Sequence, residues 1–527
     1  MKIKAFLMSA VVAAMAFASC SDNLETPTKP TDDGIAYLSI RVETYAGATR
    51  GSAEDNGAAE SDLKSLYLLT FDNGGNIVGI PGGTYYIPIA SGSTNPDAVK
   101  VSSAATRLLV IANPGTKLLG VINGVNATSN FASLNVAITA AAMGEITDDV
   151  TSITKGFAMI NSGDDTGKNA GDVISDPLID LTGKIQKVSD YESQADAEAA
   201  AKAAAEAARV TVPIERLASK LELKTKTTID VLPAGATFEF GNWTVDGINT
   251  TFFPYAEKTI LGVTHVGTWY KKNFYTKDPN FTGTVGAGIS YTKIDKTGDY
   301  SPILVAPYTW MAKDIKTYAI ENTMAAAEQK YGNATRIVIK GKYYPVASWT
   351  GDWFNFAGKN YETLALLQAA YTAAGAGSNL ETVCDKMFDK IDAYATAKAL
   401  TLTGTDFSTL TEADLALIPN GGEVIKDGTN DVIRWYQDGL SYYYYEIRHD
   451  NETTKEMDFG KYGIVRNNWY SLTLGKINGA GTPWYPNIEE PGPGDPDPTD
   501  PIDESAGYLG ITISVAPWII WNNEIGV

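Results

Sequence analysis

Short segments with a two-residue period recur along most of this chain, and this pattern limits the possible folds more than any other feature. In the segment 37–43, the apolar residues Leu38, Ile40 and Val42 alternate with polar ones. Because successive side chains of a strand point to opposite faces of a sheet, this alternation predicts a strand with one buried face. Similar segments, separated by glycine, asparagine and proline, continue along the chain, so the sequence predicts a mainly β protein.

Three segments depart from this pattern and predict helices. Residues 191–208 are rich in alanine, which has the highest helix propensity, and carry little apolar stripe, so we expect a solvated helix laid on a sheet. Residues 314–330 are also predicted to be helical. Between 360 and 400, apolar residues recur at three- and four-residue spacing and predict an amphipathic helix, with an inert Cys384 on its buried face. The residues of this stripe are Leu380, Val383, Cys384, Met387, Ile391 and Tyr394.

Composition excludes several classes of protein. Only two cysteines occur among 527 residues, so the fold is not a disulfide scaffold and must be stabilised by buried apolar cores. The chain is long enough for two or three domains. Its net charge of −20 would be repelled by phosphate backbones, which argues against nucleic-acid binding.

The start of the chain is typical of an export signal. Lys2 and Lys4 form a basic beginning, and the apolar run 6–17 that follows is too short to span a bilayer as a helix. Small residues then precede Cys20, which favours a lipoprotein signal peptide over 1–19, with the cysteine thiol acylated after cleavage. An ordinary signal peptide with an incidental cysteine is the alternative.

The strand at 37–43 lies before a loop of small and polar residues. This loop contains Arg50 followed by Gly51, a plausible target for a trypsin-like protease. Cutting there would release residues 20–50, including the lipid and the strand. Because a sheet that loses a strand presents unpaired backbone donors and acceptors, the vacated groove would be a template for another strand.

The carboxyl-terminal region supplies a strand that could fill such a groove. Residues 487–507 contain five prolines and many acids and predict an extended, semi-rigid spacer that reaches roughly 3 Å per residue. A one-faced strand follows within 508–527, and its apolar residues are Leu509, Ile511, Ile513 and Val515. Burying four such side chains contributes roughly 6–12 kcal/mol, which favours strand exchange between copies.

The sequence contains no pattern that we associate with catalysis. His265 and His449 lie far apart and lack metal-ligand spacing, so we expect no metal site, no cofactor and no enzyme. The aromatic run from Tyr442 to Tyr445 could form a sugar-binding platform, but packing in the core or at the edge of a sheet is the favoured interpretation.

Several longer segments resemble a known family. They are VPIERLASKLEL (212–223), YAIENTMAAAEQKYGNATRIVIKGKYYP (318–345), GKYGIVRNNWYSLTLGKINGAGTP (460–483) and ITISVAPW (511–518). Together with the lipoprotein-like start and the context of Arg50, these segments resemble the fimbrillins of the Bacteroidales, close to the shaft subunit of the short (minor) fimbriae in the type V pilin family. The resemblance covers almost the whole chain.

The resemblance implies two transthyretin-like β-sandwich domains with helical insertions and a detachable strand at each end. The expected order is a signal peptide (1–19), a propeptide (20–50), an N-terminal domain (51–210), a C-terminal domain (211–486) with a helical insertion at about 355–430, a spacer (487–507) and an exchange strand (508–527).

The resemblance also implies a function. The precursor would be held at the outer membrane by the lipid on Cys20, trimmed after Arg50 by an Arg-specific surface protease, and polymerised by strand exchange into an adhesive fimbrium on the cell surface. Its expected partners are copies of itself joined head to tail, accessory and anchor fimbrial subunits, and ligands on host or bacterial surfaces. Two alternatives remain open, a fimbrial tip or accessory adhesin and a monomeric glycan-binding surface lipoprotein.

Overall fold

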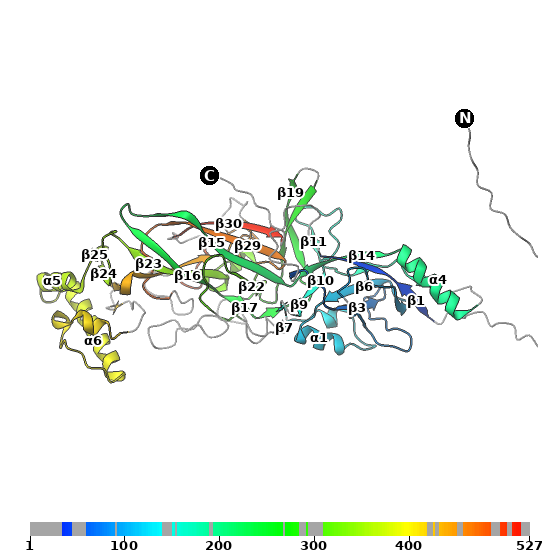
Figure 1. Ribbon diagram of the computed structural model, residues 1–527, viewed down its shortest axis with the longest axis horizontal. Helices are drawn as coiled ribbons and strands as arrows, with labels where there is room; N and C mark the ends of the chain where they lie inside the picture. The colour runs from blue at the N-terminus through cyan, green and yellow to red at the C-terminus, as the bar shows by residue number, and fades with distance from the viewer. Residues whose placement is uncertain are drawn as a thin grey trace, which may run out of the picture.

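The computed structural model describes most of the chain and leaves several segments undescribed. The described residues are 34–44, 60–89, 92–139, 150–152, 155–188, 193–266, 269–283, 291–292, 309–418, 425–426, 432–450, 457–485, 496–502 and 509–517. They form an elongated molecule with strand β1 (Ile35–Leu38) and helix α4 (Gln194–Ala207) toward one end (Figure 1). Helices α5 (Leu364–Ala374) and α6 (Asn379–Ala397) lie at the opposite end.

Two sheets form the amino-terminal part of the molecule. The larger has seven strands, in the order β2-β14-β10-β6-β3-β4 with β12 also paired to β6, and the smaller has the order β13-β1-β5. Their strands are β2 (Ile40–Thr44), β3 (Leu66–Phe71), β4 (Ile87–Ile89), β5 (Val99–Ser102), β6 (Arg107–Ala112), β10 (Met159–Asn161), β12 (Ile179–Asp180), β13 (Gln186–Lys187) and β14 (Val210–Arg216). Other short elements are α1 (Thr116–Asn123), α2 (Phe131–Leu134), β7 (Ile138–Thr139), β8 (Thr151–Ser152), β9 (Gly156–Phe157) and β11 (Val173–Ile174).

Two further sheets form the carboxyl-terminal part, with orders β22-β15-β29-β30 and β16-β23-β28. Their strands are β15 (Ala218–Val231), β16 (Thr237–Asp246), β22 (Lys316–Ile320), β23 (Arg336–Tyr344), β28 (Leu440–Glu446), β29 (Asn468–Ile477) and β30 (Leu509–Pro517). Smaller pairings involve β17 (Ile248–Asn249), β18 (Thr251–Phe252), β19 (Lys258–Val266), β20 (Trp269–Thr276) and β21 (Tyr291–Thr292). One continuous cluster of buried apolar residues extends through both parts.

The two parts are joined by nearly continuous strands. β14 belongs to the larger amino-terminal sheet and β15 to a carboxyl-terminal sheet, and only the buried Leu217 separates them. The expected domain boundary at 210/211 falls after the first residue of β14, whereas the chain changes sheet at Leu217. Two short pairings, β11 with β19 and β7 with β18, also connect the two parts.

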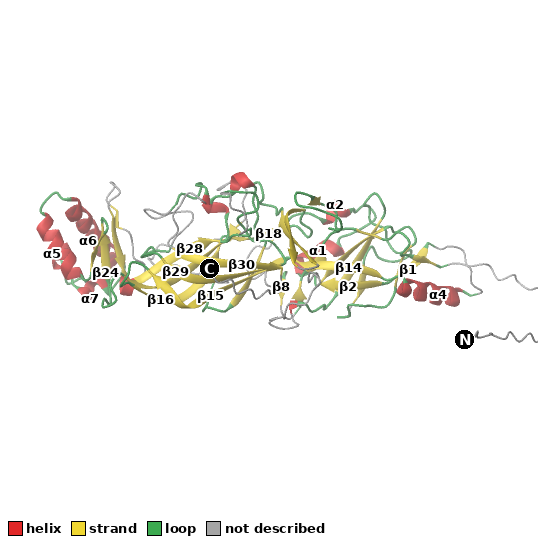
Figure 2. Ribbon diagram, turned by 90° about the horizontal axis from the view of Figure 1, so that it is seen from above, coloured by secondary structure: helices red, strands yellow, loops and turns green. Residues whose placement is uncertain are grey.

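The region of the expected helical insertion (about 355–430) has a core of its own. Helices α5, α6 and α7 (Glu412–Leu415) pack with a four-stranded sheet at the end of the molecule (Figure 2). The strands are β24 (Trp353–Phe356), β25 (Lys359–Tyr361), β26 (Ile425–Lys426) and β27 (Val432–Tyr436). The amphipathic pattern between 360 and 400 is confirmed in α6, where Cys384 is buried and burial raises the pKa of its thiol.

The prediction of a mainly β fold is confirmed, and one predicted helix is wrong. Residues 314–330 form β22 and a 3-10 turn at Ala326–Glu328 instead of a helix. The reason is tertiary pairing, because β22 lies antiparallel to β15 and buries Ala319 and Ile320 against it. Within the described residues, no helix is both long enough and apolar enough to cross a membrane.

Candidate functional site

The amino-terminal strand that the sequence predicts is buried in the chain's own sheets. Leu38, Ile40 and Val42 expose 0, 1 and 2% of their surface and belong to the main core. The predicted single strand is broken at Ser39 into β1 and β2, which pair in different sheets. The three apolar residues therefore make a continuous contribution to the core although the backbone changes sheet between them.

Each half of this segment has its own hydrogen-bonded neighbours. β1 lies between β5 and β13 and is antiparallel to both. β2 is the outermost strand of the larger sheet and runs parallel to β14, with Ile40 opposite Val210 and Arg41 opposite Thr211. Loss of the segment 35–44 would therefore leave the backbones of β5, β13 and β14 unpaired along this line.

Polar contacts fix the break between β1 and β2. The buried Ser39 hydroxyl accepts a hydrogen bond from Arg209 Nε at 2.9 Å, and the Ser39 carbonyl accepts one from the Val210 N–H at 2.9 Å. The Asn95 amide oxygen accepts from both Arg209 Nη1 at 3.3 Å and Arg41 Nε at 3.2 Å. The segment is thus held by side chains as well as by its backbone ladders.

Helix α4 covers the outer face of β1, which the alternating pattern alone would leave exposed. Tyr37 is fully buried there among three alanines of the helix, Ala197, Ala201 and Ala205. Its hydroxyl donates to Glu198 Oε2 at 2.9 Å, and Lys100 Nζ lies 3.3 Å from Glu198 Oε1. Burial and the hydrogen bond to Glu198 raise the pKa of Tyr37. The helix predicted at 191–208 is confirmed, but its alanine stripe makes one face a packing surface.

The carboxyl-terminal strand β30 is less deeply buried than β1 and β2. It is the outermost strand of its sheet and pairs antiparallel with β29. Leu509 exposes 9% of its surface, Ile511 is partly exposed and Thr512 is exposed. Ile513 and Val515 lie within β30, and their side chains are outside the described part of the structure.

Part of the predicted spacer is fastened to the body of the molecule. The carbonyls of Pro498 and Ile502 accept hydrogen bonds from the Gly332 N–H at 2.8 Å and the Tyr331 hydroxyl at 2.5 Å. The Ile502 side chain is buried in a small apolar cluster that also contains Tyr331. Within the extended, semi-rigid spacer predicted over 487–507, residues 496–502 are therefore attached to the carboxyl-terminal part through Ile502.

The predicted modification sites fall outside the described residues. These are Cys20 and the pair Arg50 and Gly51. The described structure resumes at Glu60, whose buried carboxylate oxygens both lie 2.8 Å from Lys220 Nζ. No local pattern in the sequence indicates this ion pair, because its two members are separated by 160 positions.

Arg216 and Tyr318 also hold the Glu60 region. Arg216 Nε donates to the Glu60 carbonyl at 2.9 Å, and the Tyr318 hydroxyl donates to the Glu60 carboxylate. The chain is therefore anchored firmly on both sides of the segment that contains Arg50, by β2 on one side and by these contacts on the other.

The two histidines and the tyrosine run are the remaining candidates for binding a ligand. His449 is buried, with Nδ1 2.7 Å from the Tyr470 hydroxyl. His265 lies in β19, and its side chain is outside the described part. Tyr442 and Tyr443 are buried in the core, which agrees with packing rather than a sugar platform. No group of His, Cys, Asp or Glu side chains that could hold a metal ion occurs within the described ranges.

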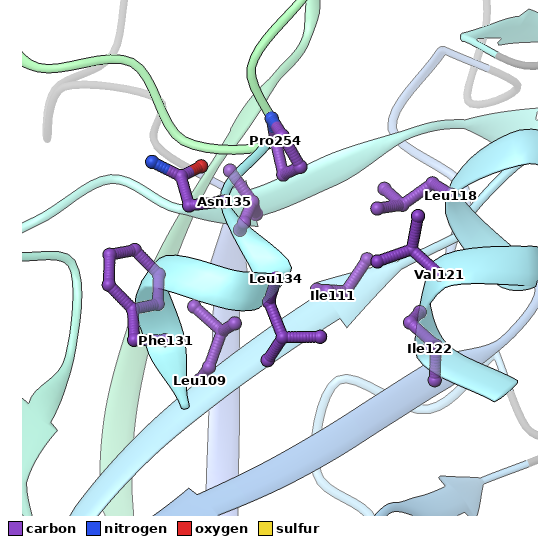
Figure 3. Close-up of a pocket in the computed structure, with 10 residues that line it drawn as sticks. Leu109, Ile111, Leu118, Val121, Ile122, Phe131, Leu134, Asn135 and Pro254 are labelled. Carbon is purple, nitrogen blue, oxygen red and sulfur yellow. The ribbon is translucent and has the colours of Figure 1, made fainter. Parts of the chain in front are cut away.

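A small pocket lies between helices α1 and α2 and the larger amino-terminal sheet (Figure 3). Its cavity volume of about 10 Å³ is far below the roughly 300–1,000 Å³ typical of ligand sites. Its one polar side chain is Asn135, whose amide oxygen accepts a hydrogen bond from the Tyr255 N–H at 2.8 Å. The other residues that line it are Leu109, Ile111, Leu118, Val121, Ile122, Phe131, Leu134, Ile160 and Pro254. This pocket has the character of a packing gap.

Three solved structures with a distant likeness to this chain are described as fimbrial proteins. The fimbrilin (FimA) from Porphyromonas gingivalis W83 is 13% identical, with 92% of this chain and 98% of that chain covered and a TM-score of 0.38. The tip fimbrial protein Mfa3 from Porphyromonas gingivalis is 12% identical, with 92 and 100% covered and a TM-score of 0.34. A fimbrial protein from Bacteroides vulgatus is 8% identical, with 92 and 99% covered and a TM-score of 0.26. No curated protein matches the sequence.

Two family models match the chain itself. Residues 36–198 match the major fimbrial subunit protein (FimA), and residues 434–524 match the carboxyl-terminal part of the major fimbrial subunit protein type IV, fimbrillin. The first match begins within β1 and the second includes β30. Proteins of these families are structural subunits of cell-surface fimbriae and not enzymes. With one match in each half, the chain is similar to the fimbrillins over residues 36–198 and 434–524.

Proposed function

We propose that this protein is the shaft subunit of a fimbrium and polymerises by strand exchange. It is exported as a lipoprotein precursor acylated at Cys20 and is trimmed after Arg50 by an Arg-specific surface protease. The strand β30 of one copy then enters the groove that β1 and β2 leave in the next copy. The lipid on Cys20 holds the unassembled precursor at the outer membrane until the cut releases it.

One observation carries this proposal. β1 and β2 are integral to the amino-terminal core, yet within the chain they precede the segment that contains Arg50. The burial of Leu38, Ile40 and Val42 stabilises the fold by roughly 5–9 kcal/mol, at about 1.5–3 kcal/mol each. While the segment is attached, its effective concentration at the groove is high, on the order of millimolar. After a cut it becomes a separate peptide that can be replaced.

The position of β30 supports its role as the donor. In its own sheet, β30 pairs with β29 along one edge, and Ile511 remains partly exposed. In the vacated groove a strand would have neighbours on both sides in the smaller sheet and β14 in the larger one. Transfer of β30 would therefore bury more apolar surface and form additional backbone hydrogen bonds.

The same arrangement favours a filament over a closed dimer. The groove lies in the amino-terminal sheets, whereas β30 lies in a carboxyl-terminal sheet (Figure 1). A contact between two different surfaces is heterologous, and heterologous contacts that do not close generate open filaments. Each added copy would present a new groove and use one donor strand.

The test is to treat the purified precursor with an Arg-specific protease and follow the formation of polymers on a gel. We expect a ladder of polymers from the parent protein and none from Arg50→Ala. Arg41→Ala is the matched control, because Arg41 lies in the removed segment and leaves the cut after Arg50 available. Deletion of 508–527 should leave trimmed subunits that cap a growing fibre without extending it. Clean trimming that leaves monomers would contradict the proposal and favour the monomeric lipoprotein.

A further inference from the structure

The two terminal strands share a sequence pattern. Residues 37–42 read YLSIRV and residues 508–513 read YLGITI, and the pattern Tyr-Leu-x-Ile occurs at these two places only in the 527 residues. An alignment on this pattern needs no gap. It matches Leu38 and Ile40 with identical residues and replaces Val42 with Ile513. The carboxyl-terminal strand is therefore a sequence analogue of the strand that fills the groove.

The alignment also agrees with the burial of each position. Ser39 is buried at the break between β1 and β2, and its counterpart is Gly510, which is smaller. Arg41 is exposed, and its counterpart Thr512 is polar. A shift by one residue would turn every apolar side chain to the opposite face.

Shifts by two residues also fail. A shift in one direction would place Tyr508 at the buried Ser39, where the hydroxyl accepts a hydrogen bond from Arg209. A shift in the other direction would place Leu509 at the fully buried Ala36 and would leave the site of Tyr37 to a glycine. Both shifts disturb close packing, one by overfilling and one by leaving a void. One register of the donor strand therefore fits the groove.

The surroundings of Tyr37 explain why the pattern begins with tyrosine. The ring is buried under the alanines of α4, and the hydroxyl donates to Glu198 at 2.9 Å. A phenylalanine would fill the same space but would leave Glu198 without this donor. Tyr508 carries the same phenol into the first position of the donor strand.

We propose that the donor strand of a second copy enters the groove in the register that puts Tyr508 at the site of Tyr37. The strand then runs in the direction of the segment it replaces, parallel to β14 and antiparallel to β5. Helix α4 acts as a clasp over Tyr508, and Glu198 accepts the hydrogen bond from its hydroxyl. Tyr508 is thus the residue that sets the register. This inference rests on the proposed function.

A disulfide cross-link tests the register directly. Arg41 lies opposite the exposed Thr211 in the β2–β14 ladder, so the proposed register puts Thr512 of a second copy opposite Thr211. The variant with Thr512→Cys and Thr211→Cys should form an intermolecular disulfide ladder in trimmed fibres treated with a mild oxidant. The matched control combines Ser514→Cys with Thr211→Cys, because Ser514 would lie two positions further along, opposite Pro213. We expect little cross-linking in the control.

The outcomes separate this inference from the proposed function. Fibres that form normally but cross-link through Ser514→Cys, or through neither pair, would overturn the register and leave strand exchange intact. Failure of the trimmed parent protein to form fibres would overturn the proposed function itself.

A second measurement tests the clasp. Tyr508→Phe should slow polymerisation roughly tenfold, because hydrogen bonds to charged groups contribute on the order of a factor of ten. Tyr508→Ala should slow it further, and Glu206→Gln, an exposed change on the same helix, should leave the rate unchanged. Polymerisation of Tyr508→Ala at the parent rate would overturn the role of Tyr508.

Discussion

Buried charged side chains show how single residues hold this molecule together. Lys220 and Glu60 form an ion pair in which both side chains are almost completely removed from water. Arg336 donates to Asp246 at 3.0 and 2.8 Å in a similarly buried pair. Removing either member of such a pair destabilises the fold strongly, because the remaining charge stays buried without its partner. The Glu60 pair matters most for the proposed function, since it fixes the chain after the cleavage segment.

Replacing Lys220 with Met should therefore destabilise the protein strongly. We expect the free energy of unfolding to fall by about 3–5 kcal/mol, because Glu60 would remain buried without its cation. Urea unfolding measured by tryptophan fluorescence checks this value. The control is Lys64→Met, whose ion pair with Asp62 is exposed and should contribute less than about 1 kcal/mol. Equal losses of unfolding free energy in the two variants would contradict the stabilising role of the buried Lys220–Glu60 pair.

The raised pKa of Glu446 predicts that the stability of the fold depends on pH. It lies on β28 opposite Arg336, and burial raises the pKa of its carboxyl to about 7 although Arg336 and Arg448 oppose the shift. The folded state then binds a proton more tightly than the unfolded state. This stabilising effect is complete below about pH 4.5 and is lost as the pH rises toward 7.

We expect Glu446→Gln to reduce this loss of stability between pH 4.5 and 7. Glu215 and Asp278 also have raised pKa values from burial and add a change of the same sign, so the difference between variant and parent is the informative quantity. Urea unfolding across this pH range measures it, with the exposed Glu239→Gln as the control. Parallel plots of unfolding free energy against pH for Glu446→Gln and the parent would contradict the raised pKa of Glu446.

At the scale of elements, the sequence predicts individual strands better than their surroundings. The two-residue period identifies Leu38, Ile40 and Val42 as core residues, and all three are buried. It cannot show that Ser39 breaks the strand, because the hydrogen bond that fixes the break comes from Arg209, which is 170 positions away. Long-range contacts of this kind leave no periodic signal.

Helix α4 shows that sequence patterns also predict a helix better than they predict its packing face. Propensity predicts its presence, but its buried stripe consists of alanines and is too weak to identify a packing face. The burial of Tyr37 was therefore missed. The repeated Tyr-Leu-x-Ile pattern was a signal in the sequence that could have drawn attention to this residue.

Ile502 provides a test of how the donor strand is restrained before exchange. Ile502→Ser would remove a buried side chain and loosen the attachment of 496–502 to the body. We expect faster hydrogen exchange of the β30 amides, because this attachment limits local opening of the strand. Mass spectrometry of peptides that cover β30 measures the rate. Thr499→Ala, an exposed change in the same segment, is the control. Unchanged hydrogen exchange of β30 in Ile502→Ser would show that Ile502 does not restrain the strand.

For the whole molecule, we propose that its amino-terminal sheets are completed first by its own segment and later by a neighbour's. The elongated arrangement places the groove and the insertion region with α5 and α6 toward opposite ends (Figure 1). The order of the sheets could not be derived from periodicity, because β14 and β15 read as one strand although they belong to different sheets.

The most direct test is the composition of the assembled fibre. Trimmed fibres should be separated from soluble material, dissociated in denaturant and analysed by intact mass spectrometry. We expect subunits that begin at Gly51, with the peptide that contains β1 and β2 recovered in the soluble fraction. Fibres that retain this peptide in equal amount with the subunit would contradict it, because the groove would then never have been vacated.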